Sequence, residues 1–204
     1  MNDFKPADPN LMVLSSLFTS ATEHASVAMD KWTNGNISLS LDELREVALE
    51  DVTDELDIGD ELFTMVVLNL EGELGGQLIL TFDEENGRQL AASLLGREPN
   101  TDPEWSPLEK SALNETGNIL ACAYMTVLTE VIAATLVPSP PFFIQDYGAS
   151  VLQQAVMTQA MVSDRVLICR TIFQRGDEIL NWNIFFVPTE ELLAALENAV
   201  ETIT

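Results

Sequence analysis

The sequence has 204 residues, 47% of them hydrophobic, and its 9 basic and 33 acidic residues give a net charge of −24. This length and apolar content predict one domain of ordinary size, or two small halves that share a core, rather than a disordered chain. The negative charge argues against nucleic-acid and membrane partners, because phosphates and anionic membrane surfaces would repel the chain.

Several absences narrow the class of protein further. The first ten residues lack the apolar segment of a secretion signal, and the apolar runs at 119–125 and 131–137 are too short to span a bilayer. The two cysteines, Cys122 and Cys169, lack metal-ligand spacing and are predicted to be reduced core residues. His24 is the single histidine, so neither a metal site nor a catalytic triad is expected. We expect a cytoplasmic protein that holds no cofactor.

The first half of the chain predicts a long helix, a short strand, a weakly helical acidic segment, a hairpin and a second helix. These elements are expected at Pro9–Trp32, 37–41, 43–52, 62–70 with 77–82, and 84–95. Asp83 is expected to cap the last helix, and Gly96 is expected to end it.

A proline-containing linker, residues 97–106, leads into a second half that repeats this order. Its elements are expected at 107–134, 135–137 with 142–145, 149–159, 164–173 with 178–187, and 189–202. The repetition predicts two half-repeats, about 10–96 and 107–204, related by a pseudo-twofold axis within a single domain, 1–204. Their hairpins are expected to share one mainly antiparallel sheet with helices packed against it, which is an α/β (α+β) fold.

The helix expected at 107–134 carries an unusual polar stripe. Ser106, Pro107 and Glu109 have the spacing of an N-cap, a first helical residue and the partner in a capping box. Further along, three polar residues follow at i, i+4 and i+7, which places their side chains on one stripe of the helix. They are Ser111, Glu115 and Asn118. About half a turn round from them lies the expected buried side, formed by Leu113, Leu120, Val127 and Val131.

Gly117 and Asn118 are costly choices for the middle of a helix. Relative to alanine, glycine costs about 1 kcal/mol and asparagine roughly half of that. Two interpretations stay open at this point: a solvated polar face with an incidental asparagine, or a surface that meets a partner.

The residues around this stripe resemble a known family. Ser111-x3-Glu115-x2-Asn118, continued by Ile119-Leu120-Ala121-x2-Tyr124, is similar to the active-site helix of the CheC/CheX/FliY phosphatases of bacterial chemotaxis. The string GNILACAY is the more specific part, and the following segments at 137–141 and 146–149 also resemble the family in their order. The resemblance covers both halves and implies the CheC-like architecture described above.

The resemblance also implies an activity and residue roles. It implies a hydrolase that acts on the phospho-aspartate of a CheY-type response-regulator receiver in two-component signalling. Asn118 would orient the attacking water, because a primary amide can accept from water and donate to a phosphoryl oxygen. Glu115 would engage the receiver's lysine, and Ser111 would support the site. The receiver itself would supply Mg²⁺.

The first helix carries a degenerate copy of the stripe. Subtracting 92 from positions 111, 115 and 118 gives Thr19, Glu23 and Ser26. The glutamate is kept, but a hydroxyl replaces the carboxamide, so only the stripe on the second long helix is expected to work. A solvated helix face is the alternative for these three residues.

Two further functional hypotheses remain from the sequence. One is a non-catalytic adaptor of the same fold that binds a receiver or the flagellar switch, as related domains do. The other is a homodimer formed through an apolar or β-edge surface, which would be compatible with catalysis. The deamidase CheD, which some family members bind, is a further candidate partner.

Overall fold

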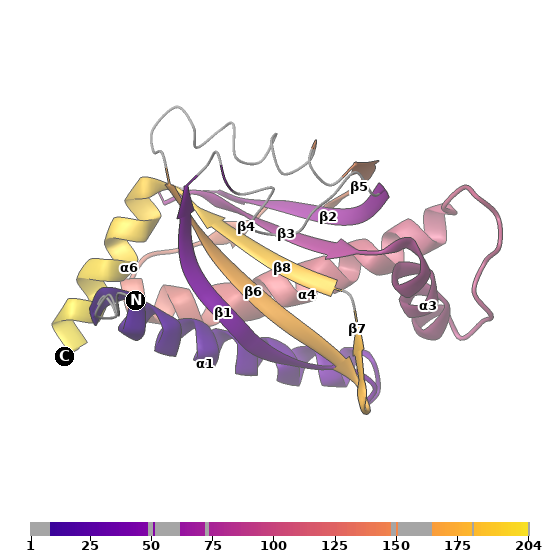
Figure 1. The fold of residues 1–204 in the computed structure, drawn as a ribbon, viewed down its shortest axis with the longest axis horizontal. Helices are drawn as coiled ribbons and strands as arrows, with labels where there is room; N and C mark the ends of the chain where they lie inside the picture. Colours follow the sequence, from indigo (N-terminus) through magenta and orange to yellow (C-terminus); the bar gives the residue numbers. More distant parts are fainter. Residues whose placement is uncertain are drawn as a thin grey trace, which may run out of the picture.

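The computed structural model describes residues 9–48, 51, 62–71, 74–147, 150, 165–180 and 182–203. In the first half, the elements are α1 (Pro9–Trp32), β1 (Ser38–Ala48), β2 (Leu62–Glu71), β3 (Gly76–Phe82) and α3 (Glu84–Leu95). In the second half, they are α4 (Pro107–Ile132), β4 (Val137–Pro138), β5 (Phe142–Tyr147), β6 (Arg165–Arg175), β7 (Glu178–Leu180), β8 (Trp182–Pro188) and α6 (Glu190–Ile203). The mixed α/β class predicted from the sequence is confirmed (Figure 1).

The long helices and the first hairpin lie where the sequence predicts them. Asp83 caps α3 by accepting a hydrogen bond from the Asn86 amide, and Gly96 ends the helix in the left-handed conformation, with φ of 62°. The predicted helix at 149–159 lies outside the described residues, apart from Ser150.

The prediction of helical character at 43–52 is wrong for the part that the structure describes. Residues up to Ala48 continue strand β1, which pairs antiparallel with β6. A register shift between Leu41 and Glu43 breaks the alternation of the strand. Leu41 and Leu44 therefore both pack towards the main core although they are three residues apart. This spacing, typical of a helix, is the product of a β-bulge.

The second predicted hairpin is correct at its turn, but its returning strand is divided. β7 pairs with β6 through only three residue pairs, from Arg175↔Glu178 to Phe173↔Leu180. β8 then pairs antiparallel with β3 along its whole length, from Trp182 to Pro188. The returning strand thus pairs with β6 only next to the hairpin turn. Its continuation, β8, then pairs with β3 and so links the second half to the first.

The strands of the two halves are exchanged. β1 of the first half pairs with β6 of the second, and β5 of the second half pairs with β2 of the first. In the described residues the hydrogen bonds form a three-stranded and a five-stranded group, and β6 lies alongside β8 where the two groups meet (Figure 1). Read across the molecule, the order is β1, β6, β8, β3, β2, β5, which is the same pattern from either end.

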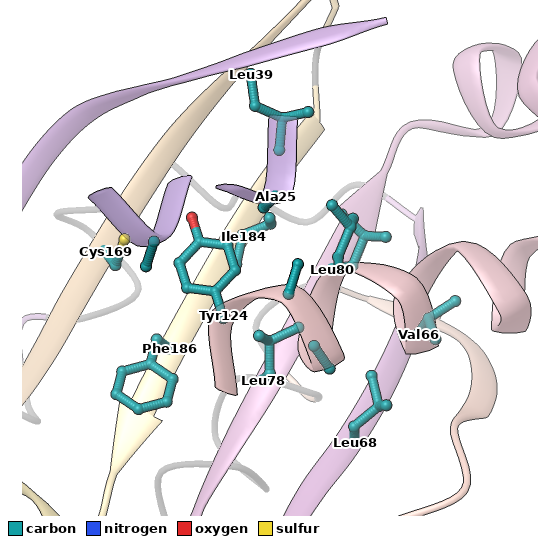
Figure 2. Close-up of a cluster of buried hydrophobic side chains, with 14 of the residues drawn as sticks. Ala25, Leu39, Val66, Leu68, Leu78, Leu80, Tyr124, Cys169, Ile184 and Phe186 are labelled. Atoms are coloured by element: carbon teal, nitrogen blue, oxygen red, sulfur yellow. The ribbon is translucent and has the colours of Figure 1, made fainter. Parts of the chain in front are cut away.

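The long helices α1 and α4 pack against each other on one face of the strands, with α6 across one end and α3 near the other (Figure 1). The core between helices and strands is apolar, and Figure 2 shows Tyr124 of α4 among side chains from several strands. Val47, Met65, Ile79 and Phe185 belong to a second buried cluster formed by side chains of β1, β2, β3 and β8. No helix in the described part of the chain combines the length and the apolarity needed to cross a membrane.

Candidate functional site

Helix α4 begins at a buried network of charges. The capping box is formed: Ser106 Oγ accepts from the Glu109 amide at 3.3 Å, and Glu109 Oε2 accepts from the Ser106 amide at 2.9 Å. The Glu109 carboxylate is 1% exposed and also pairs with Arg97 at 3.1 Å and Arg88 at 3.8 Å. Burial alone would raise the pKa of this carboxyl, but hydrogen bonds from Ser106 and Asn100 and the charge of Arg97 lower it overall.

The middle of α4 lies unusually close to the sheet. A Cβ atom built on Gly117 would lie 2.5 Å from Val66 Cγ1 and 3.3 Å from Val66 Cβ, both on strand β2. No side chain fits in that gap, so the glycine that is costly for the helix is required by packing. Gly117 thus sets how closely α4 approaches strand β2 at the residue that precedes Asn118.

Hydrogen bonds to α1 hold the same part of α4 from the side. Tyr124 is fully buried, and its hydroxyl lies 2.7 Å from Thr22 Oγ1 on α1 and 3.2 Å from Thr171 Oγ1 on β6. Trp32 Nε1 donates to Thr116 Oγ1 at 3.1 Å. The backbone beneath the stripe is therefore fixed on two sides.

The stripe itself faces outwards. Ser111 and Glu115 are exposed and Asn118 is partly exposed, whereas Leu113 and Leu120 on the opposite side are fully buried. Among the residues that the structure describes, the side chains of Ser111 and Glu115 form no hydrogen bond or ion pair. Their polar atoms are thus available to a partner. The expected buried residues Val127 and Val131 are only partly buried.

Cys122 extends this stripe, and the prediction that it is a core residue is wrong. It is exposed, one turn beyond Asn118, and its Sγ donates to Asn118 Oδ1 at 3.8 Å. Burial and the nearby charge of Glu115 raise the pKa of its thiol. Cys169 is buried as predicted. The spacing of four residues from Asn118 is the signal in the sequence that could have placed Cys122 on the stripe.

In the first half, the structure places Thr19, Glu23 and Ser26 along α1, but two of the three are engaged within the protein. Ser26 Oγ accepts a hydrogen bond from the backbone amide of Leu39 at 2.9 Å, which ties α1 to the start of β1. Thr19 Oγ1 donates to the carbonyl of Ser15 in its own helix at 2.8 Å, and Glu23 is exposed. The hydroxyl that replaces the carboxamide thus has a structural contact.

Helix α4 itself carries little charge around Asn118, although the chain as a whole is strongly acidic. Between residues 110 and 129, Lys110 and Glu115 are the only charged residues, so their charges cancel. Lys110 Nζ lies 5.2 Å from the centre of the Phe143 ring on β5. Among the described residues, no group of three or more His, Cys, Asp or Glu side chains is arranged to hold a metal ion.

No established family profile matches the sequence. Two of the curated proteins that are similar to it are chemotaxis phosphatases by name. The CheY-P phosphatase CheC of Bacillus subtilis (strain 168) is 27% identical over 182 residues, which cover 85% of this chain and 87% of the relative. The putative CheY-P phosphatase CheC1 of Halobacterium salinarum is 23% identical over 146 residues, covering 72% and 74%.

Solved structures agree with this relationship at the level of the fold. FliY of Thermotoga maritima has a TM-score of 0.74 at 16% identity, covering 98% of this chain and 100% of FliY. The FliM middle domain of H. pylori has a TM-score of 0.66 at 13% identity, covering 96% of this chain and 98% of that domain. The CheX–CheY–BeF3–Mg²⁺ complex of Borrelia burgdorferi matches with a TM-score of 0.57 at 20% identity, covering 85% and 98%.

The chain is thus a mixed α/β protein with the fold of the FliY, FliM and CheX structures. The similarity to CheC in sequence and to FliY and CheX in fold supports a CheC/CheX/FliY-type family, in agreement with the resemblance of the residues around Asn118.

Proposed function

We propose that this protein hydrolyses the phospho-aspartate of a CheY-type receiver, and that the stripe on α4 is its active site. The observation that carries the proposal is the placement of the Asn118 carboxamide, partly exposed and one turn from the free Glu115 carboxylate, on a helix fixed from behind. The relatives named CheY-P phosphatase CheC support the same reaction.

In this mechanism Asn118 positions the nucleophile. Its carbonyl oxygen accepts a hydrogen bond from the attacking water, and its NH2 group donates to a phosphoryl oxygen. Positioning is a large part of catalysis in phosphoryl transfer, so one well-held amide is a sufficient contribution from this chain. Mg²⁺ belongs to the receiver, where it neutralises charge on the phosphoryl group.

Glu115 and Ser111 would act on the docked receiver rather than on the water. The carboxylate of Glu115, exposed and without an internal partner among the described residues, would pair with the receiver's lysine. Ser111, exposed one turn earlier, would make a supporting contact. The low charge of α4 between 110 and 129 would ease the approach of a phosphoryl anion to a chain whose net charge is −24.

The first helix would not carry a second working site. Ser26 already accepts from the Leu39 amide, and a hydroxyl provides one donor where a carboxamide provides two. Ser26 would instead hold α1 against β1. The exposed side chains of Thr19 and Glu23 would form part of the solvated face of α1.

A non-catalytic adaptor is the second candidate function. The structural similarity to FliM, whose solved structures include a FliG–FliM complex from H. pylori, favours this alternative. It requires that the chain bind its partner without accelerating loss of the phosphoryl group.

The test is the decay of a phosphorylated CheY-type receiver from the same organism, measured alone and with each protein variant. Asn118→Ala is expected to reduce the added decay rate roughly 100-fold, because the water is no longer held in line. Glu130→Gln is the control: it changes an exposed side chain of the same helix, about three turns beyond Asn118, and is expected to keep the activity.

Two outcomes would contradict the phosphatase. Unchanged activity in a folded Asn118→Ala protein would show that this residue does not hold the water. Equal decay with and without the wild-type protein, with binding still detected by titration, would favour the adaptor.

A further inference from the structure

Cys122 lies on the proposed active-site stripe, one helical turn beyond Asn118. We propose that Cys122 is a positioning residue: its S–H group donates to Asn118 Oδ1 and fixes the direction in which the carboxamide faces. This inference rests on the proposed function, because it assigns a role in that reaction to a residue that contacts Asn118 and not the receiver's phosphoryl group.

The geometry supports a directed contact. A carboxamide can be turned over with little change in shape, so its orientation is decided by its hydrogen-bond partners. The distance from Cys122 Sγ to Asn118 Oδ1 is 3.8 Å, within the range of a sulfur donor, and no other hydrogen bond of the Asn118 side chain occurs within the described residues. The carbonyl therefore faces Cys122, and the NH2 group is left to face away from it, towards a docked phosphoryl group.

The protonation of the thiol agrees with this role. A thiol can donate a hydrogen bond, whereas a thiolate cannot and would repel a phosphoryl anion. The ordinary pKa of the thiol, 9.0, is already above neutral pH, and partial burial and the carboxylate of Glu115 raise the pKa of Cys122 further, so the S–H form prevails.

The first half provides an internal comparison. Position 122 minus 92 is 30, and Asp30 is an exposed carboxylate. Where the second half places a carboxamide followed by a neutral donor, the first half places Ser26 followed by an anion that can only accept hydrogen bonds. The two residues differ together, as expected if they act as a pair.

The first experiment measures the hydrogen bond without any receiver. The rate at which iodoacetamide alkylates Cys122 is followed by peptide mass spectrometry at pH 7, with Cys169 protected because it is fully buried. Asn118→Leu keeps the bulk but removes the acceptor, so a thiol no longer held towards Asn118 should be free to turn to solvent and alkylation should become about threefold faster. Asn114→Leu is the control and should leave the rate unchanged. An unchanged or slower rate in Asn118→Leu would overturn the contact.

The second experiment measures its catalytic consequence. Cys122→Ala is expected to lower kcat for the phosphorylated receiver about three- to tenfold with KM unchanged, and Cys122→Ser, which keeps a donor, should retain more of kcat. Wild-type kcat in Cys122→Ala, or equal loss in both variants, would overturn the inference alone. A wild-type protein that does not accelerate decay would overturn the proposed function as well.

Discussion

A contact across the helix–sheet interface explains why position 117 of α4 is a glycine. Gly117 lies where α4 passes over Val66, a fully buried residue of β2 that is stiff because it branches at Cβ. A methyl group on Gly117 would have to occupy the space of Val66 Cγ1, so either the helix or the valine would have to move. Any such movement would also displace Asn118, the next residue in the chain.

Gly117→Ala is therefore expected to destabilise the protein although alanine is the better helix former. Overpacking costs about 1–3 kcal/mol in a dense core, and the gain in helix propensity of about 1 kcal/mol returns only part of this. Urea unfolding measures the change in the free energy of unfolding. Val66→Ala removes the clashing methyl group, so the double variant should lose less stability than the sum of the two single variants. Strict additivity would contradict the close contact.

The sequence predicts the residues of the stripe because helical periodicity is a local property. Ser111, Glu115 and Asn118 share a face in any straight helix, so the spacing alone decides their arrangement. The structural use of Ser26 and the exposure of Cys122 depend on which side of each helix the other elements cover. Local spacing aligns Cys122 with Asn118 but does not say which side of the helix is covered, and a cysteine is most often buried.

At the scale of elements, the start of α4 is held by charges as well as by its cap. Glu109 occupies the third helical position and receives hydrogen bonds from Ser106, while Arg88 of α3 and Arg97 of the linker pair with its carboxylate. Arg88 is itself buried over the Trp105 ring, at 4.1 Å from its centre. The network thus attaches the linker and α3 to the helix that carries the proposed site.

Glu109→Gln is expected to lower the free energy of unfolding by roughly 2–4 kcal/mol near pH 7, because it leaves a buried arginine without one anionic partner. The pKa of Glu109 is lower in the folded protein than its ordinary value of 4.5. Its contribution is therefore complete above that value and is lost as the pH falls through the lowered pKa of the folded state.

Denaturant unfolding of the wild type and the variant across this acid range measures the difference. The gap between them should be widest near neutral pH and should close in acid. The exposed Glu98→Gln serves as the control and should change the stability little at any pH. A gap that persists in acid would show that packing, not charge, explains the effect of Glu109→Gln.

Elements with a local signal were predictable, and those shaped by distant partners were not. Caps at Asp83 and Ser106 and the glycine at 96 define helix ends within a few residues of sequence. The bulge in β1 is different, because it is defined by the register with β6, which lies more than 120 residues further along the chain. The division of the last hairpin has a similar cause, since the partner of β8 is β3 in the other half.

At the scale of the whole molecule, strands of each half pair with strands of the other half. β1 completes the second half by pairing with β6, and β5 completes the first half by pairing with β2. We propose on this basis that 1–204 is one folding unit, because either half-repeat alone would lack a neighbouring strand and would leave the inner face of its long helix uncovered.

Cutting the chain within the linker tests this proposal. Fragments 1–100 and 101–204 should each lack a cooperative thermal transition, and mixing them should restore one together with a heterodimer on size exclusion. Far-UV circular dichroism of the separate and mixed fragments measures the gain in structure. A fragment that alone unfolds cooperatively as a monomer would contradict the proposal.

The sequence predicts the repeat itself because both halves present the same order of elements. The offset of 92 residues even aligns Glu23 with Glu115. The exchange of strands was not predictable in the same way. Pairing within a half and pairing between halves satisfy the same hydrophobic pattern, and only the assembled core distinguishes them.

The strand order, which is the same from either end, has a consequence for the two long helices. It gives α1 and α4 equivalent neighbours, so each helix presents an equivalent polar stripe. An assembly of two identical copies would have to carry the same residues on both helices, whereas a single chain does not. α4 carries Asn118, and at the equivalent position α1 carries Ser26, which accepts a hydrogen bond from the Leu39 amide.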